Sequence, residues 1–336
     1  MKNEPKGTEN DSRRAFVRGA GLVGGGLLAS ALVGGAEPAA AQAQTSNSAG
    51  DAANARAKLR RLIQARKLFP TPVIHDALSA KLSEYHGFEC VFAGGYPISY
   101  ATYGIGDYGM ITITELIEFA SRIQGMLNIP VIADADDLGG NPLNVYRSVQ
   151  RYEFGGVGGL MMEDMFGAKH VPGVREGLMY STEGMVDRIK AALDARKDKD
   201  FVILVRTDAL SAKEPAQKME ERIMAYTQAG ADALFVAGGS LQEVPRLTKM
   251  TNKPFMAVTT NVPLAEQVKN EVVLGSISVP LVGLAAGAVH KALGELKKTG
   301  IIEEMKERSL PSDVMAALLR SAEAAEIAKK YNAFRL

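Results

Sequence analysis

Short apolar runs alternate with helical patterns along most of this chain. A run of this kind is typical of a buried strand, whereas apolar residues three and four apart mark one face of a helix. The expected strands are Pro72–His75, Cys90–Ala93, Val131–Ala135, Gly159–Met162, Phe201–Thr207, Ala233–Val236, Phe255–Val258 and Val272–Ser278. The helices expected between them include Leu143–Tyr152, Glu183–Arg196 and Pro215–Gly230.

Eight strands that alternate with helices predict an α/β fold, a (β/α)₈ barrel of the TIM type. An open doubly wound sheet is the alternative, but the repeat lacks a clear nucleotide-binding fingerprint, which favours closure. An extra helix, Ala52–Leu68, precedes the barrel, and the helices Ile301–Arg308 and Asp313–Tyr331 follow it. Because an apolar helix outside a closed barrel needs a surface to cover it, we expect this tail to pack on another subunit.

The first 43 residues have the pattern of an export signal. The pair Arg13-Arg14 is followed by an uncharged, glycine-rich stretch from residue 19 to 36, and Ala41-Gln42-Ala43 offers a small-residue cleavage site. A membrane anchor is the alternative, but the glycines make the stretch too weakly apolar. We therefore expect a twin-arginine signal peptide over residues 1–43, use of the twin-arginine export machinery, and a periplasmic protein with no stable membrane insertion after cleavage.

The mature chain is expected to hold a flexible linker over residues 44–51 and a single barrel domain, with its C-terminal helices, over residues 52–336. The chain has 39 Lys and Arg against 38 Asp and Glu, a balance that argues against nucleic acid as a partner. Cys90 is its one cysteine, so an internal disulfide is excluded. The four histidines have no zinc-ligand spacing, which argues against structural zinc.

Acidic residues follow two of the expected strands. Asp134, Asp136 and Asp137 come after one strand, and Glu163 and Asp164 come after the next. The carboxyl ends of barrel strands meet at one open face, so these side chains should converge there and repel one another unless a cation neutralises them. Oxygen ligands alone suit Mg²⁺, which Mn²⁺ could replace. The metal-site interpretation is favoured for Asp134, Asp136 and Glu163, whereas helix caps or solvated loop charges are favoured for Asp137 and Asp164.

Five motifs in this order resemble the isocitrate lyase / phosphoenolpyruvate mutase superfamily, from about Lys58 to Tyr331. They are Asp76-Ala77-Leu78-Ser79-Ala80, Ala93-Gly94-Gly95, Asp134-Ala135-Asp136, Glu163-Asp164 and Arg206-Thr207-Asp208-Ala209. The resemblance implies a (β/α)₈ barrel, a C-terminal helix swapped between subunits, and a homodimer or homotetramer. It also implies Mg²⁺-dependent chemistry on small 2-oxo or 2-hydroxy acids.

The resemblance also implies roles for individual residues. Asp134 matches a direct metal ligand, Asp136 and Glu163 match residues that hold the metal's waters, and Asp76 matches an acidic residue near those waters. Gly94 and Gly95 resemble a turn whose N–H groups hold the substrate, with Tyr96 closing the pocket, and Arg206 matches an arginine that pairs with a substrate carboxylate. For Arg206 a salt bridge to Asp208 or Glu183 is the alternative, and for the glycines a plain tight turn. Asn261, which follows the seventh strand, is placed to bind a second carboxylate or hydroxyl.

The chain departs from the superfamily pattern at two places. Isocitrate and methylisocitrate lyases carry a Lys-Lys-Cys-Gly-His loop. In this chain Val171 stands where the catalytic cysteine of that loop would be. The chain therefore resembles the cysteine-free branch, which includes oxaloacetate decarboxylases and phosphonomutases. Lys169 or His170 could donate the proton instead, and a solvated loop charge is the alternative for each. At residues 137–140 the superfamily usually has a small residue followed by Gly, an aromatic residue and Gly, whereas this chain has Asp-Leu-Gly-Gly. The motifs therefore do not identify the substrate.

The leading hypothesis is a Mg²⁺-dependent lyase for a small carboxylate substrate. It would cleave a C–C bond, by decarboxylation or a retro-aldol step, in a 2-oxo or 2-hydroxy dicarboxylic acid through an enolate. A mutase or hydrolase of phosphonopyruvate-type substrates is the first alternative. A periplasmic carboxylate-binding protein without catalysis is the second.

Overall fold

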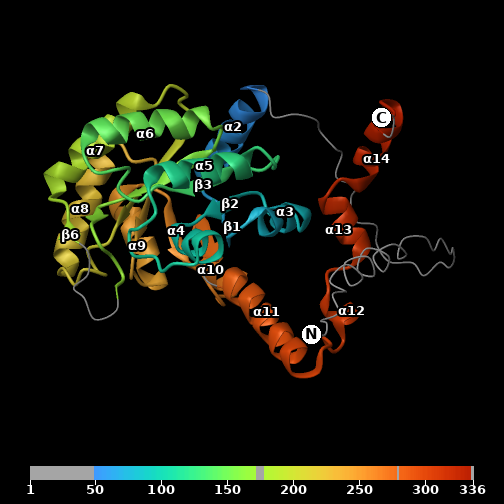
Figure 1. Cartoon of the computed structure of the whole chain (residues 1–336). Helices are drawn as coiled ribbons and strands as arrows, with labels where there is room; N and C mark the ends of the chain where they lie inside the picture. Colours follow the sequence, from blue (N-terminus) through green and yellow to red (C-terminus); the bar gives the residue numbers. More distant parts are fainter. Residues whose placement is uncertain (1–48, 172–177, 278–279, 334–336) are drawn as a thin grey trace, which may run out of the picture. The chain divides into compact units, whose positions relative to one another are not determined.

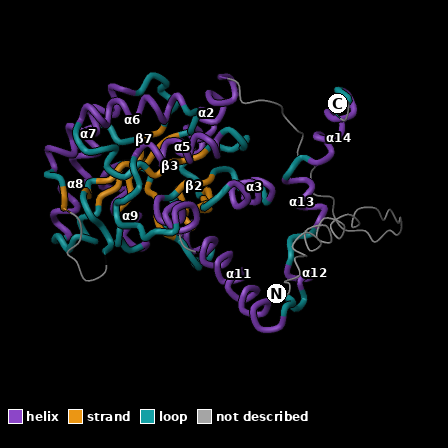
Figure 2. Tube along the Cα trace, viewed as in Figure 1, coloured by secondary structure: helices purple, strands orange, loops and turns teal. Residues whose placement is uncertain are grey.

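A computed structural model describes residues 49–171, 178–277 and 280–333 of the chain. Eight parallel strands close into a barrel in the order β1-β10-β9-β8-β7-β4-β3-β2. Figure 1 shows the strands enclosed by helices, and Figure 2 shows the same arrangement coloured by secondary structure. The barrel strands are β1 Phe69–Ile74, β2 Val91–Ala93, β3 Val131–Asp134, β4 Gly159–Glu163, β7 Val202–Thr207, β8 Ala233–Val236, β9 Phe255–Val258 and β10 Leu274–Ile277.

The predicted barrel is therefore confirmed, and each of the eight expected strands is present. The bounds shift by a few residues, since β1 begins at Phe69 instead of Pro72 and β10 at Leu274 instead of Val272. A short antiparallel pair outside the barrel was not expected from the sequence. It consists of β5 Met165–Phe166 and β6 Leu178–Met179.

Helices cover the barrel and begin at sequence signals that satisfy their free N–H groups. The side chain of Asn141 accepts hydrogen bonds from the N–H groups of Leu143 and Asn144, and Pro142 fills the first position of α6. Gly230, with φ of 110°, ends α8 in a conformation that favours glycine. The helices up to the last strand are α2 Ala49–Ala65, α3 Ala77–Tyr85, α4 Gly95–Ile98, α5 Ile113–Gln124, α6 Pro142–Phe154, α7 Thr182–Ala195, α8 Ala216–Ala229, α9 Val244–Thr251 and α10 Leu264–Lys269, with a π-helical turn Ser99–Tyr103 and a 3₁₀ turn Leu241–Glu243.

Two apolar layers hold the barrel together. One fills the space between the strands and the surrounding helices, and the other lies inside the barrel, where Phe92, Ile132 and Leu204 are buried together. Leu59 and Ile63 of α2 belong to the inner layer, so the extra N-terminal helix is part of the domain. Because the interior is filled, the chemistry must take place at an open end of the barrel.

The segments on either side of the barrel correct the sequence-based boundaries. The predicted linker 44–51 ends earlier than expected, because α2 begins at Ala49. The predicted helix Asp313–Tyr331 is wrong as a single element, because Arg320 has φ of 52° and interrupts it. Only part of the expected helix Ile301–Arg308 is helical. The tail consists of α11 Pro280–Thr299, α12 Met305–Arg308, α13 Ser312–Leu318 and α14 Ser321–Lys330.

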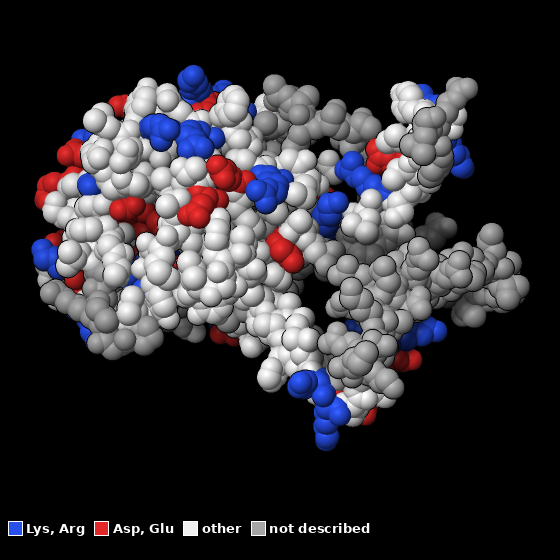
Figure 3. All heavy atoms as spheres, viewed as in Figure 1, with Lys and Arg blue, Asp and Glu red and all other residues white. Residues whose placement is uncertain are grey.

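The proposed signal peptide, residues 1–43, lies outside the described residues. Within the described residues, every helix is too short or too polar to cross a membrane. On the face shown in Figure 3, acidic and basic side chains are interspersed and neither kind forms a continuous patch.

Candidate metal centre at the mouth of the barrel

Three carboxylates meet where β3 and β4 end. Asp134 is the last residue of β3, Asp136 follows two residues later, and Glu163 is the last residue of β4. The two strands are parallel neighbours, which brings their carboxyl ends side by side. One carboxylate oxygen from each residue lies within 4.8 Å of the others. The structure thus brings together the three residues that the sequence predicts as a metal site.

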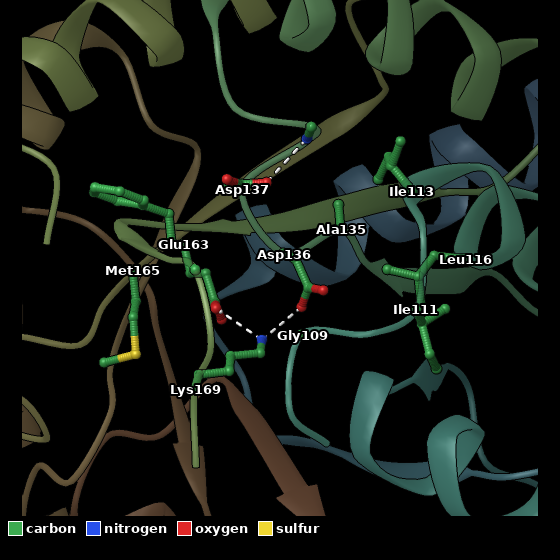
Figure 4. A pocket seen from close by; sticks show the side chains of 13 residues that line it. Gly109, Ile111, Ile113, Leu116, Ala135, Asp136, Asp137, Glu163, Met165 and Lys169 are labelled. Carbon is green, nitrogen blue, oxygen red and sulfur yellow. Dashed lines mark hydrogen bonds and ion pairs between the residues drawn. The ribbon is translucent and has the colours of Figure 1, made fainter. Parts of the chain in front are cut away.

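Two basic side chains face this acidic cluster, and Figure 4 shows one of them, Lys169. The Nζ atom of Lys169 lies 2.7 Å from Oδ1 of Asp136 and 2.8 Å from Oε1 of Glu163. Nη1 of Arg206 lies 3.3 Å from Oε2 of Glu163, which is buried and has no hydrogen-bond partner in the described structure. Three carboxylates are therefore balanced by two cations, one of which contacts the cluster only at longer range.

Burial and the neighbouring charges shift the pKa values of the cluster. Burial raises the pKa of Asp136 to about 7, and the charges of Asp134 and Glu163 add to this effect, although Lys169 opposes it. Burial also raises the pKa of Asp134. Burial acts in the same direction on Glu163, but Arg206 and Lys169 outweigh it and lower its pKa. A divalent cation beside these oxygens would favour the ionised form of all three.

Arg206 is held in place by its own strand. Its Nε and Nη2 atoms donate to the two oxygens of Asp208 at 2.7 and 2.6 Å, so the salt bridge considered as the alternative is present. The guanidinium group keeps Nη1 toward Glu163 and lies 5.6 Å from the ring centroid of Phe235. Arg206 is thus a fixed positive charge at the cluster.

The glycines at the end of β2 contact the cluster through the backbone. The N–H of Gly95 donates to Oδ2 of Asp134 at 2.9 Å, and a Cβ at this position would stand 3.2 Å from the same oxygen. Gly95 therefore allows the backbone to approach Asp134 closely. Gly94 precedes α4, and the half-buried Tyr96 ring lies 4.3 Å from the ring of Tyr100.

Sequence reasoning missed Asp107, which lies beside the predicted His170. Nδ1 of His170 is 3.4 Å from Oδ2 of Asp107. This contact raises the pKa of His170, while burial and the charge of Lys169 act in the opposite direction. Burial opposes ionisation of Asp107, but His170 and Lys169 lower its pKa. The one sequence feature that could have indicated Asp107 is its position as an acidic residue in the glycine-containing loop 104–109.

Two predicted residues have no contact with the acidic cluster in the described structure. The half-exposed side chain of Asp76 caps α3 by accepting a hydrogen bond from the N–H of Ser79, and it lies 3.8 Å from Nε2 of His75. Asn261 is exposed after β9 and has φ of 59°, with no hydrogen bond to Asp134, Asp136 or Glu163.

The expectation for Asp164 is wrong, and for Asp137 the helix-cap alternative is wrong, since it is a half-buried loop charge. Asp164 is neither a helix cap nor a solvated charge, because it is fully buried and accepts hydrogen bonds from the hydroxyls of Thr207 and Tyr226 and from the N–H of Asp208. Asp137 does not cap α6, since Asn141 does. Its oxygens accept hydrogen bonds from the hydroxyl of Tyr180 and the N–H of Gly139.

A cavity of about 210 Å³ opens beside the cluster. Backbone segments 109–113 and 165–169 line it from two sides, and a Cβ on Gly109 would stand 2.8 Å from the carbonyl oxygen of Gly167. The acidic side chains contribute one part of the wall and apolar side chains another. A cavity of this size suits a molecule of a few carbon atoms, well below the size of most drug-like ligands.

Two curated relatives are similar over much of the chain. The 2,3-dimethylmalate lyase of Eubacterium barkeri is 40% identical over 183 residues, which cover 54% of this chain and 63% of the length of that enzyme. The oxaloacetate decarboxylase of Pseudomonas fluorescens (strain SBW25) is 32% identical over 244 residues, which cover 71% of this chain and 81% of that enzyme. Both names describe cleavage of a small dicarboxylic acid.

Solved structures and a family model agree with these relatives. Phosphonopyruvate hydrolase in complex with oxalate and Mg²⁺ superimposes with a TM-score of 0.73 at 27% identity, over 83% of this chain and 99% of that one. A 2,3-dimethylmalate lyase, described as a PEP mutase/isocitrate lyase superfamily member, gives a TM-score of 0.74 at 25% identity over 83% and 95% of the two chains. Residues 59–326 match the family model for phosphoenolpyruvate phosphomutase. The chain therefore belongs to the phosphoenolpyruvate phosphomutase family, within the superfamily that its motifs resemble.

Proposed function

We propose that this chain is a Mg²⁺-dependent lyase that cleaves a C–C bond in a small 2-oxo or 2-hydroxy dicarboxylic acid through an enolate. The observation that carries this proposal is the convergence of Asp134, Asp136 and Glu163 beside Lys169 and Arg206, at the edge of a small cavity. The names of the relatives support decarboxylation or a retro-aldol step as the type of cleavage.

The acidic cluster fits a magnesium ion. Its ligand atoms are all carboxylate oxygens, and Oε2 of Glu163 is buried without a hydrogen-bond donor. Asp134, Asp136 and Glu163 would hold the ion, and Mn²⁺ could replace it because it prefers the same ligands. When bound, the ion supplies Lewis acidity that stabilises the negative charge on an enolate oxygen.

The basic residues of the site have separate roles in the proposed reaction. Arg206, fixed by Asp208, offers a positive charge to a substrate carboxylate. Burial opposes the charge of Lys169, but Glu163 and Asp136 outweigh it and raise its pKa well above the usual value, so this lysine stays protonated. His170 is the better proton donor to the enolate carbon, because its raised pKa lies closer to neutral pH.

We also assign the outer contacts of the site. Gly94, Tyr96 and Asn261 are proposed to contact the substrate, and Asp76 to assist near the metal's waters, as the motifs imply. The N–H of Gly95 supports this region indirectly, since it already holds Asp134. Substitution of Tyr96, Asn261 or Asp76 by alanine tests each role, with a rise of KM expected for the substrate contacts.

One assay separates the candidate functions. The purified mature protein with Mg²⁺ is offered oxaloacetate, 2,3-dimethylmalate, methylisocitrate and phosphonopyruvate, and the release of pyruvate, CO₂, other carbonyl products and phosphate is followed. C–C cleavage that disappears with EDTA and in Asp134→Ala supports the lyase. The surface variant Leu143→Ala is the matched control, because this side chain is 82% exposed.

The same assay decides the two alternatives. Phosphate release from phosphonopyruvate would favour the P–C bond mutase or hydrolase, which the phosphonopyruvate hydrolase structure supports. Binding of a dicarboxylate without turnover, unaffected by EDTA, would contradict the lyase and favour a carboxylate-binding protein.

We further propose that the protein is exported and assembles with itself. Export rests on the twin-arginine pattern of residues 1–43, and a fusion of these residues to a reporter, compared with Arg13→Lys and Arg14→Lys together, tests delivery to the periplasm. Assembly rests on the tail, since α11 exposes the apolar side chains Leu284, Val289, Leu293 and Leu296. The proposed assembly is a homodimer or homotetramer in which helices are swapped. Light scattering should give the mass of this oligomer, and Leu284→Asp together with Leu293→Asp should lower the mass to that of a monomer.

A further inference from the structure

The segment 134–140, which leads from the end of β3 toward α6, carries two of the three carboxylates of the acidic cluster. Within it Asp136 has φ of 44° and Leu138 has φ of 58°, and the two glycines that follow also have positive φ values. Left-handed backbone is unfavourable for residues with a Cβ atom, so local preference does not hold this segment in shape. Contacts from outside it must stabilise the conformation in which Asp136 points toward Lys169 (Figure 4).

Helix α6 supplies three hydrogen bonds to this segment from one face. Each comes from a polar side chain and ends on a backbone carbonyl oxygen. The bonds run from Tyr152 to Asp134 at 2.9 Å, from Ser148 to Leu138 at 3.2 Å and from Asn144 to Gly139 at 2.7 Å. The three donors are four residues apart, so they lie in one row along the helix.

Two of these donors are buried. Tyr152 and Ser148 lie where bulk water does not reach, whereas Asn144 is exposed and water can take over its bond. A buried carbonyl that loses its donor is left unpaired, which costs free energy unless the backbone turns toward another donor. The conformation of the segment therefore depends mainly on the two hydroxyls.

Tyr152 acts at the peptide group between the metal ligands. The carbonyl that accepts its hydroxyl belongs to the peptide bond from Asp134 to Ala135, so this hydrogen bond fixes the direction of the chain between two of the carboxylates. The next carbonyl but one, that of Asp136, accepts the N–H of Glu163 at 2.9 Å. Rotation of the first peptide group would therefore move Asp136 relative to Asp134 and Glu163.

We propose that Tyr152 and Ser148 are positioning residues for the metal centre, which hold segment 134–140 so that the three carboxylates converge on one ion. The inference rests on the proposed function, which places Mg²⁺ at the acidic cluster. In this role each hydroxyl acts through a backbone carbonyl and touches neither the ion nor the substrate. Loss of a support of this kind weakens metal binding by about tenfold or more.

Calorimetric titration of the metal-free mature protein with Mg²⁺ tests this role without requiring turnover. Tyr152→Phe keeps the ring and removes only the hydroxyl, so we expect the Kd for Mg²⁺ to rise about tenfold. Ser148→Ala should raise it about threefold, because its hydrogen bond is longer and lies farther from the carboxylates. A Kd of Tyr152→Phe within about twofold of the unmodified value would overturn the proposal.

Tyr226→Phe is the matched control for Tyr152→Phe. This tyrosine is also fully buried, but its hydroxyl donates to Asp164, outside segment 134–140. Both variants lose one buried hydrogen bond and should lose stability, whereas only Tyr152→Phe should lose affinity for Mg²⁺. Equal weakening of Mg²⁺ binding in the two would mean that any buried hydroxyl has this effect, and would overturn the proposal.

The second hydroxyl keeps the question decidable if Tyr152→Phe fails to fold. Ser148→Ala is then compared with Ser83→Ala, because Ser83 is also buried and donates to a carbonyl oxygen, at 2.8 Å, within α3. We expect weaker Mg²⁺ binding in Ser148→Ala alone. Equal Kd values for Mg²⁺ in these two variants would overturn the proposal.

Failure of this inference is distinguishable from failure of the proposed function. A protein that cleaves a dicarboxylic acid with Mg²⁺ but binds Mg²⁺ equally well in Tyr152→Phe refutes the positioning role alone. A protein that loses Mg²⁺ affinity in Tyr152→Phe but cleaves none of the dicarboxylic acids refutes the lyase alone. Absence of Mg²⁺ binding by the unmodified protein would overturn the inference together with the metal site.

Discussion

Glu163 and Asp164 are neighbours in the chain and both are buried, yet their surroundings differ completely. Glu163 faces the cavity, where one of its oxygens has no hydrogen-bond donor. Asp164 faces away from it and accepts three hydrogen bonds, from Thr207, Asp208 and Tyr226. Successive side chains at the end of a strand point to opposite sides, so one position places a carboxylate in the site and the next places one in the scaffold.

The difference shows how to tell a ligand from a scaffold residue among buried acids. A carboxylate whose oxygens are all occupied by protein donors joins elements together, and Asp164 links β4 to β7 and α8 in this way. The acidic cluster instead has more negative charge than its neighbours neutralise, and the pKa of Asp136 rises to about 7. A buried carboxylate oxygen without a hydrogen-bond donor, in a group of acids that outnumbers its cations, is therefore the mark of the candidate metal centre.

The largest effect should come from removing a charge from the cluster. Asp136→Asn is expected to lower kcat/KM with Mg²⁺ on the order of a thousandfold, because it removes an anionic oxygen from the metal site. The free energy of unfolding at pH 8 should not fall. A carboxylate whose pKa is raised to about 7 by folding costs stability as pH rises from its ordinary pKa to about 7, and the whole cost is present at pH 8. Steady-state kinetics and chemical denaturation measure both quantities. Unchanged turnover would remove Asp136 from the site.

Loss of Lys169 should destabilise the metal-free protein more than the Mg²⁺-loaded protein. Lys169→Met leaves Asp136 and Glu163 without their shared ammonium group, so we expect the free energy of unfolding to fall by about 3 kcal/mol in EDTA. Saturating Mg²⁺ should restore most of this loss, because the ion supplies the missing positive charge. Lys218→Met is the control, since its pair with Glu221 is on the surface. Equal losses with and without Mg²⁺ would show that the lysine has only a packing role.

Removal of a hydrogen bond to Asp164 should lower the stability of the protein and leave metal binding unchanged. Tyr226→Phe removes a donor to Asp164, and we expect a loss of about 1.5 kcal/mol at pH 8 with unchanged affinity for Mg²⁺. Burial raises the pKa of Asp164 to about 6, so the hydroxyl stabilises the carboxylate above that pH. The loss should therefore shrink as pH falls through 6 and Asp164 takes up a proton. A weaker affinity for Mg²⁺ in this variant would mean that the two regions are coupled.

The sequence predicts the barrel and the acidic cluster because both follow from local pattern. Strand ends in a closed parallel barrel share one face, so the positions of Asp134, Asp136 and Glu163 in the chain suffice to bring them together. Asp164 could not be assigned in this way. Its donors lie 43 to 62 residues away, on elements whose orientation depends on packing.

Other residues were missed for similar reasons. Asp107 lies in a loop with no periodic pattern, and its partner His170 is distant in the sequence. For Arg206 the sequence offered the salt bridge to Asp208, but not the contact with Glu163, which depends on the side-chain rotamers. The break at Arg320 lies between two stretches that each have good helix-forming residues, so composition alone predicts one helix.

The smallest effect concerns His170 and its partner Asp107, which stand at the exposed edge of the site. We expect His170 to titrate above 6.5 by NMR, because the contact with Asp107 favours the protonated ring. The stability gained from this pair is fully present below pH 6.5 and is lost as pH rises through the higher pKa of the folded protein. Asp107→Asn should return the midpoint toward 6.5, and His170→Asn identifies the resonance among those of the four histidines. A midpoint that does not move in Asp107→Asn would show that the two residues do not pair in solution, and would leave the proton donor of the proposed reaction to be sought elsewhere.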